Sequence, residues 1–377
     1  MRARLLLALV TGICTLAAIE GALWAFHPLA AGPHKLAHRF LPGYHAMAPA
    51  PRVIEFDPGP LPNVTPGIRH IHVNRYGYCY PEEQRLRSSP DEVRIAAIGG
   101  STVECSALTE DNQWPAVLEN LLQRALPERP ITVLNLGLSA MDTRTHLATM
   151  CQHVTSLDVD VVVFMLGAND LSRVGEGELP LLSPDNFYVP TTLSRELASM
   201  LRQTQIGRHR ELWKSQRRQV PRTTPYFLEQ AEHQAALPEL EAPLSMSANA
   251  LAGYARNIVS LAGICREHGI AAVFTTQPTM LTAAPTAAEQ AVLWGFHLGS
   301  HRLSAANFVD LLGALNQRLI ETCAARGYAC VDLAAAIPKG LGCYYDQVHF
   351  TDTGARRVAE TLLLPIRELI AQRTARR

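Results

Sequence analysis

Short apolar runs alternate with amphipathic stretches along most of the chain after residue 90. Continuous apolar runs indicate strands that are buried on both faces, and apolar residues at the spacing of one helix face indicate helices. The strands are predicted at 93–98, 131–136, 159–166, 270–275 and 328–333. The helices are predicted at 115–126, 251–268, 308–326 and 353–372. This alternation predicts an α/β fold, in which a parallel sheet is covered by helices on both faces.

The N-terminus carries a different pattern. Arg2 and Arg4 precede an apolar run of 22 residues, 5–26, which is interrupted by Glu20 and by small polar residues. About 20 residues span the hydrocarbon core of a bilayer, whereas the apolar core of a cleavable signal is about 7–15 residues long. We therefore predict a transmembrane helix within 1–27, kept as an anchor, with a cleaved signal as the alternative. Because positive charge stays on the cytoplasmic side, we expect a single-pass protein of the cytoplasmic membrane, with the following chain on the periplasmic or extracellular side.

Two further regions depart from the alternation of strands and helices. Residues 28–90 are predicted to form a proline-rich stalk or wrapping arm, and the stretch 28–68 within it is predicted to lack regular structure. Residues 91–372 form the predicted folded domain, which contains an insertion at 172–248. Between 202 and 222 this insertion has seven basic residues and a single acidic one, Glu211. A solvated helix face, a contact with an anionic membrane surface and a contact with an acidic polymer all fit that charge pattern.

Overall charge and cysteine content narrow the possible functions. Lys plus Arg and Asp plus Glu both number 34, so no net charge draws the chain to nucleic acid, and we predict no nucleic-acid partner. The eight cysteines include no Cys-x-x-Cys pair, which argues against a structural zinc site, and neither a metal nor another cofactor is predicted. In an oxidising compartment Cys323 and Cys330, which flank a predicted turn between a helix and a strand, are the first candidates for a disulfide.

The predicted strand ends carry polar side chains that are suited to acyl-transfer chemistry. Ser101 directly follows the glycine turn that ends the strand at 93–98, and Asn169 lies just after the strand at 159–166. In a parallel sheet the carboxyl ends of the strands meet at one edge, where ligands bind. A serine there can act as a nucleophile, and an asparagine amide can stabilise an oxyanion. A helix cap and an Asx-turn explain these residues equally well when each is taken alone.

A third polar motif, Asp346 with His349, lies near the C-terminus. On one helical turn, side chains three residues apart share a face, so the carboxylate could hold one imidazole nitrogen while the other acts on a serine hydroxyl. Taken alone, a capping or packing role is the simpler interpretation of this motif. Cys105, four residues after Ser101, has no evident base of its own, and packing or a disulfide is a simpler interpretation than a reactive thiol.

Together these motifs resemble the SGNH/GDSL hydrolase family, in the family's order, over residues 93–365. The resemblance implies a three-layer, flavodoxin-like fold with a five-stranded parallel sheet. It also implies a catalytic triad in which Ser101 is the nucleophile, His349 the general base and Asp346 the residue that orients the imidazole. The matching blocks are Gly99-Gly100-Ser101, Asn135-Leu136-Gly137-Leu138-Ser139-Ala140, Gly167-Ala168-Asn169-Asp170, and Asp346 with His349.

The resemblance further implies an oxyanion hole made by the backbone N–H groups of Ser101 and Ala140 and by the side-chain amide of Asn169. Two positions depart from the family pattern. Gly100 replaces the usual aspartate, which carries no catalytic proton, so activity is expected to survive this change. Ala140 replaces the usual glycine; its N–H can still donate, but a left-handed backbone there would strain an alanine. Gly137 is the fallback donor.

As to function, the resemblance implies a serine esterase that removes a short acyl group, with acetate favoured, from a carbohydrate or a related envelope substrate. The expected partners are therefore an acylated carbohydrate or another small ester, and the membrane that holds the N-terminal helix. An acyltransferase that passes the group to an envelope glycan is the alternative, since both activities use one acyl-enzyme. A non-catalytic glycan-binding member is a third hypothesis, which the intact set of serine, aspartate and histidine disfavours.

Overall fold

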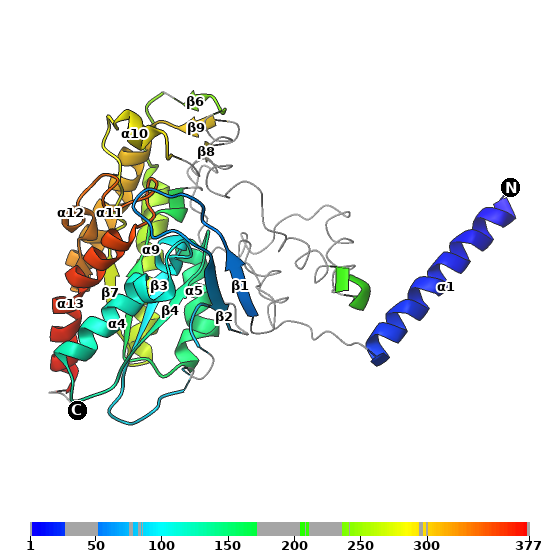
Figure 1. The fold of residues 1–377 in the computed structure, drawn as a ribbon, viewed down its shortest axis with the longest axis horizontal. Coiled ribbons are helices and arrows are strands. Elements are labelled where there is room, and N and C mark those ends of the chain that lie inside the picture. Colours follow the sequence, from blue (N-terminus) through cyan, green and yellow to red (C-terminus); the bar gives the residue numbers. More distant parts are fainter. Residues whose placement is uncertain are drawn as a thin grey trace. The chain divides into compact units, whose positions relative to one another are not determined.

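Two compact units make up the chain in the computed structural model. The first combines Met1–Pro42 with Phe187–Arg222, and the second combines Gly43–Asn186 with Thr223–Arg377. The second unit contains the five-stranded sheet (Figure 1). It also contains every predicted site residue. The structure describes residues 2–26, 52–74, 78–81, 84, 86–171, 204–207, 209–210, 236–240, 242–293, 297–298 and 301–374.

The second unit is built around a five-stranded parallel sheet. The order across the sheet is β10-β7-β5-β3-β4, which is the flavodoxin-like order. Gly99 in β3 pairs with Gly137 in β4 and with Met165 in β5, so the carboxyl ends of these three strands are level. The strand order reverses between β3 and β5, and ligands bind beside such a reversal. The strands are β3 (Val93–Gly99), β4 (Ile131–Gly137), β5 (Val161–Met165), β7 (Ala271–Thr275) and β10 (Ala329–Val331).

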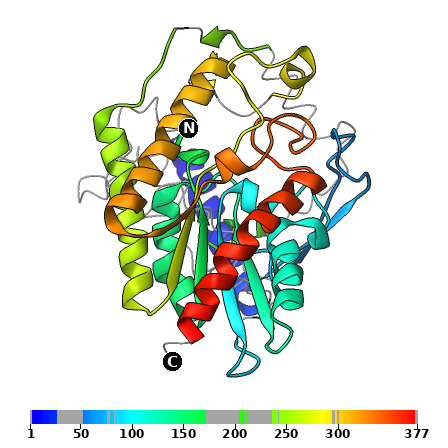
Figure 2. The ribbon, with the colours of Figure 1, turned by 90° about the vertical axis from the view of Figure 1, so that its left-hand side faces the viewer.

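Helices cover both faces of this sheet (Figures 1 and 2). In one layer α4 (Trp114–Ala125) packs against α13 (Asp352–Thr374). In the other layer α9 (Ala248–Glu267) packs against both α5 (Thr143–Gln152) and α11 (Ala305–Arg326). The predicted α/β fold with a five-stranded parallel sheet is therefore confirmed.

Local sequence sets the ends of the two long helices α9 and α11. Ser247 Oγ accepts a hydrogen bond from Ala250 N–H at the start of α9, and Ser304 Oγ accepts one from Asn307 N–H at the start of α11. A serine in this position satisfies a backbone N–H that has no partner within the helix. Gly327 ends α11 with φ +67°, the left-handed conformation in which helices commonly stop.

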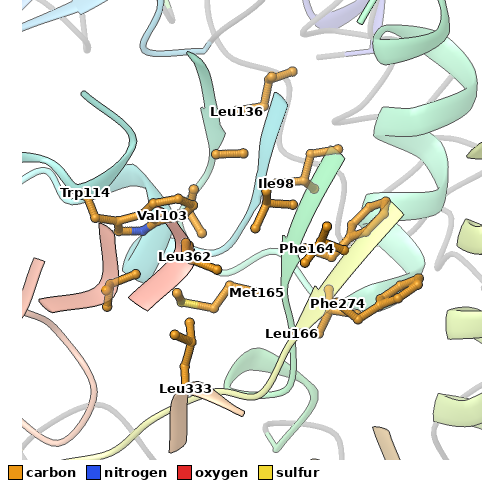
Figure 3. Close-up of a cluster of buried hydrophobic side chains, with 14 of the residues drawn as sticks. Ile98, Val103, Trp114, Leu136, Phe164, Met165, Leu166, Phe274, Leu333 and Leu362 are labelled. Carbon is orange, nitrogen blue, oxygen red and sulfur yellow. The ribbon is translucent and has the colours of Figure 1, made fainter. Parts of the chain in front are cut away.

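The centre of the sheet is buried on both faces, as its apolar sequence requires. Every residue of β3 and of β5 is buried. The rings of Phe164 and Phe274, from neighbouring strands, stack 5.1 Å apart (Figure 3). The fully buried indole of Trp114 donates from Nε1 to the carbonyl oxygen of Thr102 at 3.1 Å. This bond fixes the start of α4 against the segment that carries Ser101.

The predicted strand at 328–333 is shorter than expected. Asp332 Oδ1 accepts a hydrogen bond from Ala335 N–H and so begins a helix at the next residue, which ends β10 at Val331. This helix is one of several short elements in the same unit. They are α3 (Ser101–Glu104), α10 (Ala287–Gln290), α12 (Leu333–Ala336), the 3-10 helices η2 (Glu110–Asn112) and η3 (Val154–Ser156), and the strands β6 (Glu239–Leu240), β8 (His297–Leu298) and β9 (His301–Leu303).

The expectation that 28–68 lacks regular structure is wrong for the part of it that forms a strand. β1 (Arg52–Phe56) and β2 (Arg69–Val73) pair as an antiparallel hairpin. In β2 buried and exposed residues alternate: Ile71 and Val73 are buried and the two histidines are exposed. Arg69 is also buried, and its Nε donates to the carbonyl oxygen of Ala107 at 2.7 Å. Residues 27–51 lie outside the described residues.

The loop between these two strands is bound to the sheet domain. Asn63 Nδ2 donates to the carbonyl oxygen of Leu341 at 2.8 Å, and Thr65 Oγ1 donates to Asp352 Oδ2 at 2.6 Å. Asp352 is the first residue of α13, so the loop is tied to the helix that begins three residues after His349. The described part of the proline-rich segment therefore wraps the domain close to the predicted site.

The N-terminal segment forms one helix, α1 (Arg2–Phe26). Among the described residues no helix combines the length and the apolar composition that a membrane crossing requires, so the predicted transmembrane helix is not found. Polar residues interrupt the apolar run, above all Glu20, whose carboxylate accepts hydrogen bonds from the N–H groups of Gln205 (2.6 Å) and Ile206 (2.9 Å). The location of the protein stays a prediction, and most of the basic segment at 202–222 lies outside the described residues.

Candidate active site

Ser101 lies directly beyond the carboxyl end of β3, at the first position of α3. Gly100 precedes it with φ −82° and ψ −150°, an extended conformation that carries the chain from the strand into the helix. At the first position of a helix the backbone N–H has no acceptor within that helix. Ser101 therefore offers a hydroxyl and a backbone N–H from one residue at the edge of the sheet.

A continuous hydrogen-bond relay joins Ser101 to His349 and Asp346. Ser101 Oγ lies 2.6 Å from His349 Nε2, and His349 Nδ1 lies 2.7 Å from Asp346 Oδ2. A carboxylate only accepts hydrogen bonds, so Nδ1 carries the proton and Nε2 accepts from the serine hydroxyl. Asp346 is fully buried, and His349 is 8% exposed. The structure thus brings the three predicted triad residues together in one array.

The segment around Asp346 holds this relay without the expected helical turn. Residues 345–348 form a bend, in which Asp346 Oδ1 accepts hydrogen bonds from the N–H groups of Val348 (2.9 Å) and His349 (2.8 Å). The ring of Tyr345 stacks on the imidazole, with 5.6 Å between ring centroids and 9° between planes. The carboxylate and the stacked ring together fix the position and the rotation of the imidazole.

The chain beyond β4 makes a tight turn at residues 138–141, which we call the oxyanion turn. Met141 N–H donates to Leu138 O at 3.3 Å and closes the turn. Ala140 has φ +64°, the left-handed conformation that glycine favours at this position of a type II turn. The strain expected for an alanine there is therefore present, at about 1–2 kcal/mol. Ala140 N–H makes no hydrogen bond to any residue that the structure describes, which leaves it available to a substrate oxygen.

The side chain of Asn169, just beyond β5, lies over Gly100. A Cβ atom added at Gly100 would come within 2.2 Å of Asn169 Nδ2, so any side chain at position 100 would displace the amide. Asn169 Nδ2 also donates to the carbonyl oxygen of Met141 at 2.9 Å. Gly100, where the chain departs from the family pattern, therefore makes room for Asn169, and the amide is tied to the oxyanion turn.

Gly137 is not available as the fallback donor. Its N–H donates to Asn135 Oδ1 at 2.9 Å, which occupies the hydrogen. A Cβ atom added at Gly137 would lie 2.0 Å from the backbone nitrogen of Glu104, so β4 packs directly against α3 at this point. Gly137 thus has a packing role, and of the two candidate donors in the second block Ala140 is the one whose N–H has no acceptor among the residues that the structure describes.

Three further residues support the site, although the sequence motifs did not assign them a role. Tyr345 is the ring that stacks on the imidazole. Asp170 is buried, and its Oδ1 accepts from Thr143 Oγ1 at 2.7 Å, which anchors the start of α5. Glu104 accepts a hydrogen bond from Ser139 Oγ in the oxyanion turn, and burial, the largest effect on it, raises the pKa of this carboxyl. Its spacing of three residues from the predicted nucleophile was the one sequence signal for Glu104.

The cysteines are free thiols. Cys105 Sγ donates to Thr102 O at 3.2 Å, and burial raises the pKa of the Cys105 thiol to about 12. The candidate disulfide between Cys323 and Cys330 is not formed in the structure. Among the described residues no group of three or more His, Cys, Asp or Glu side chains is placed to hold a metal ion.

A comparison with known protein families shows to which family the chain belongs. The model of the GDSL-like lipase/acylhydrolase family matches residues 97–357. This match covers more than half of the sequence, so the chain belongs to that family and is a hydrolase that acts on ester bonds. No curated protein sequence matches the chain.

Several solved structures are similar to the chain. An acetylxylan esterase from Geobacillus stearothermophilus has 15% identity and a TM-score of 0.41, with 73% of this chain and 93% of that chain covered. A lipase/acylhydrolase from Enterococcus faecalis has 13% identity and a TM-score of 0.37, with 73% and 96% covered. An α/β hydrolase from the metagenome of Lake Arreo has 14% identity and a TM-score of 0.41, with 74% and 95% covered. At these identities and TM-scores the similarities carry no argument about activity.

The state of Cys105 can be tested by alkylation. With a pKa of about 12, the Cys105 thiol stays protonated at pH 8 and is shielded by burial, so iodoacetamide should leave it unmodified in the folded protein. Peptide mass spectrometry should find the exposed Cys151 modified under the same conditions. In denaturant both should react. Modification of folded Cys105 at the rate of Cys151 would show that a reactive thiol lies beside Ser101.

Proposed function

We propose that the chain is a serine esterase that removes a short acyl group, with acetate the first choice, from a carbohydrate or a related hydroxylated substrate. The relay from Asp346 through His349 to Ser101 carries this proposal, with its two contacts of 2.7 Å and 2.6 Å. A serine hydroxyl is a weak nucleophile unless an adjacent base removes its proton. In this chain the base is held by a buried carboxylate and by a stacked ring, and it is oriented before substrate binds.

Acylation begins when Ser101 Oγ attacks the ester carbonyl carbon and its proton passes to His349 Nε2. Asp346 stabilises the resulting imidazolium through Nδ1. The negative charge that develops on the carbonyl oxygen is stabilised by the N–H groups of Ser101 and Ala140 and by the amide of Asn169. When the tetrahedral intermediate collapses, His349 returns the proton to the leaving alcohol, and the acyl group remains on Ser101.

Deacylation runs the same steps with water as the nucleophile. His349 Nε2 takes one proton from water while the oxygen attacks the acyl carbon, and the proton then returns to Ser101 Oγ as the carboxylic acid leaves. An acyltransferase would differ only in the acceptor of the acyl group. Incubation with an acetylated oligosaccharide and a free glycan separates the two activities. Release of acetate into solution supports hydrolysis, whereas transfer of acetyl groups to the glycan would show acyltransferase activity.

Polar groups near Ser101 support a polar substrate. Glu104, in the same short helix as Ser101, accepts a hydrogen bond from Ser139 Oγ, and the Asn169 amide lies over Gly100. Sites for long apolar acyl chains are lined mainly by apolar side chains, whereas hydroxyl-rich ligands are held by convergent polar groups. A short acyl group on a sugar-like alcohol fits these neighbours better than a long-chain lipid.

The relay predicts a common loss of activity in three variants. Ser101→Ala and His349→Ala should each lower kcat on p-nitrophenyl acetate by about 10³-fold or more, because members of one relay act as a unit. Asp346→Asn should lower kcat by a smaller factor, since it disturbs the tautomer and the orientation of the imidazole. Ser260→Ala, at an exposed position of α9, is the matched control and should keep the full rate. Full turnover by Ser101→Ala would place the nucleophile elsewhere.

The contact between Gly100 and Asn169 gives a second test of the proposed chemistry. Asn169→Ala removes a donor that acts in the transition state, so kcat should fall by about 10²–10³-fold with KM nearly unchanged. Gly100→Ala should have the same effect, since its methyl group takes the place of the amide, while φ −82° is suitable for alanine. The double variant should be no slower than either single variant. A raised KM with full kcat in Asn169→Ala would show that Asn169 binds substrate instead.

A further inference from the structure

Glu104 joins the helix of Ser101 to the strand before the oxyanion turn. It is the last residue of α3, three positions after Ser101, so one short helix carries both residues. Its backbone nitrogen lies where a Cβ atom at Gly137 would be, 2.0 Å away, and its carbonyl oxygen accepts from Asn135 Nδ2 at 3.4 Å. The backbone of Glu104 is therefore packed against β4 with no space between them.

The side chain of Glu104 continues this connection into the oxyanion turn. Its carboxylate accepts a hydrogen bond from Ser139 Oγ, and Ser139 directly precedes the left-handed Ala140. At the other end of the turn, Met141 O accepts from the Asn169 amide. The oxyanion turn is thus held at both ends, by Glu104 of α3 at one end and by Asn169, just beyond β5, at the other.

We propose that Glu104 is a positioning residue, which through Ser139 holds the oxyanion turn in the conformation that directs Ala140 N–H to the substrate oxygen. This inference rests on the esterase function proposed above. Glu104 does not touch the reacting atoms in this scheme. Its effect is on where the turn lies relative to Ser101 and on how often Ala140 is left-handed.

Because residue 140 is an alanine, the oxyanion turn needs the hydrogen bond between Ser139 and Glu104. A left-handed backbone disfavours alanine relative to glycine by roughly ten-fold in population. A turn that carries glycine, as the family pattern has it, adopts the conformation without help. In this chain the Ser139 hydrogen bond to Glu104 offsets the preference of Ala140 for other conformations. Removing that bond should therefore lower the fraction of molecules with a competent oxyanion hole.

The charge of Glu104 is the competing explanation for any loss of activity. The ionisable groups with which the Glu104 carboxyl interacts are His349, Cys79, Cys105 and Tyr345. A carboxylate beside the imidazole could act on the base directly rather than on the turn. Glutamine separates the two effects, because its amide oxygen still accepts from Ser139 while its charge is lost.

The first experiment compares steady-state kinetics on p-nitrophenyl acetate. Ser139→Ala and Glu104→Ala should each lower kcat by roughly ten-fold with KM nearly unchanged, since the lost interaction acts in the transition state. The double variant should equal the single variants, because both remove the same bond. Glu104→Gln should stay near the wild-type rate. Glu128→Gln, an exposed glutamate beyond α4, is the control for loss of a carboxylate and should have no effect.

The second experiment is a rescue that a merely structural role would not produce. Glycine adopts the left-handed conformation without support, so adding Ala140→Gly to Ser139→Ala should restore most of the lost kcat. Absence of rescue, or a Glu104→Gln variant as slow as Glu104→Ala, would overturn the proposal while the esterase function stands. If the kcat of the wild-type protein on the ester were no higher than that of Ser101→Ala, the proposed esterase function would be wrong. The proposed role of Glu104 would then be wrong as well.

Discussion

The 2.6 Å contact between Ser101 Oγ and His349 Nε2 joins residues 248 positions apart, and the rest of the domain is arranged so that it can form. Ser101 follows β3, which lies in the sheet between β4 and β5. His349 precedes α13, which packs on α4, and Trp114 at the start of α4 is hydrogen-bonded to Thr102. The helix layer on one face therefore locks the imidazole to the strand end that carries the serine. The buried carboxylate of Asp346 completes the alignment by binding both the ring and the local backbone.

The oxyanion hole depends on two departures from the family pattern: one position has lost a side chain, and the other has gained one. At Gly100 a side chain is missing, and the Asn169 amide occupies the space that a Cβ atom would need. At Ala140 a methyl group is added to a left-handed residue, and the turn must be held against its own preference. The hydrogen bond from Ser139 to Glu104 supplies that support. Ser101, the oxyanion turn and the Asn169 amide are thus connected to one another. A substitution at one of them should therefore alter the position of the others.

The strands of the five-stranded sheet could be predicted from local apolar runs, whereas the residues of the relay could be predicted only from the family resemblance of several blocks taken together. β5 is buried on both faces and is apolar throughout, and β3 is apolar apart from Arg94, whose buried guanidinium is paired with Glu92. The motif residues keep fixed spacings within short blocks. Helix α5 cannot be predicted from an apolar stripe, because it buries threonine and histidine side chains. The roles of Glu104 and Tyr345 come from contacts between distant segments, and the φ of Ala140 is a tertiary property that no local pattern reports. The length and overall apolarity of the N-terminal run predict a membrane span, whereas Glu20 within it accepts hydrogen bonds from the backbone N–H groups of Gln205 and Ile206.

Covalent labelling measures most directly whether Ser101 is the activated nucleophile. A fluorophosphonate transfers its phosphonyl group to a serine oxygen only when a neighbouring base takes the proton and fluoride leaves, so reactivity reports the relay itself. Peptide mass spectrometry of the wild-type protein should find one adduct, on Ser101, which is absent in Ser101→Ala and forms far more slowly in His349→Ala. An adduct on another residue, or labelling of Ser101→Ala at the wild-type rate, would contradict the assignment of Ser101 and His349 as nucleophile and base.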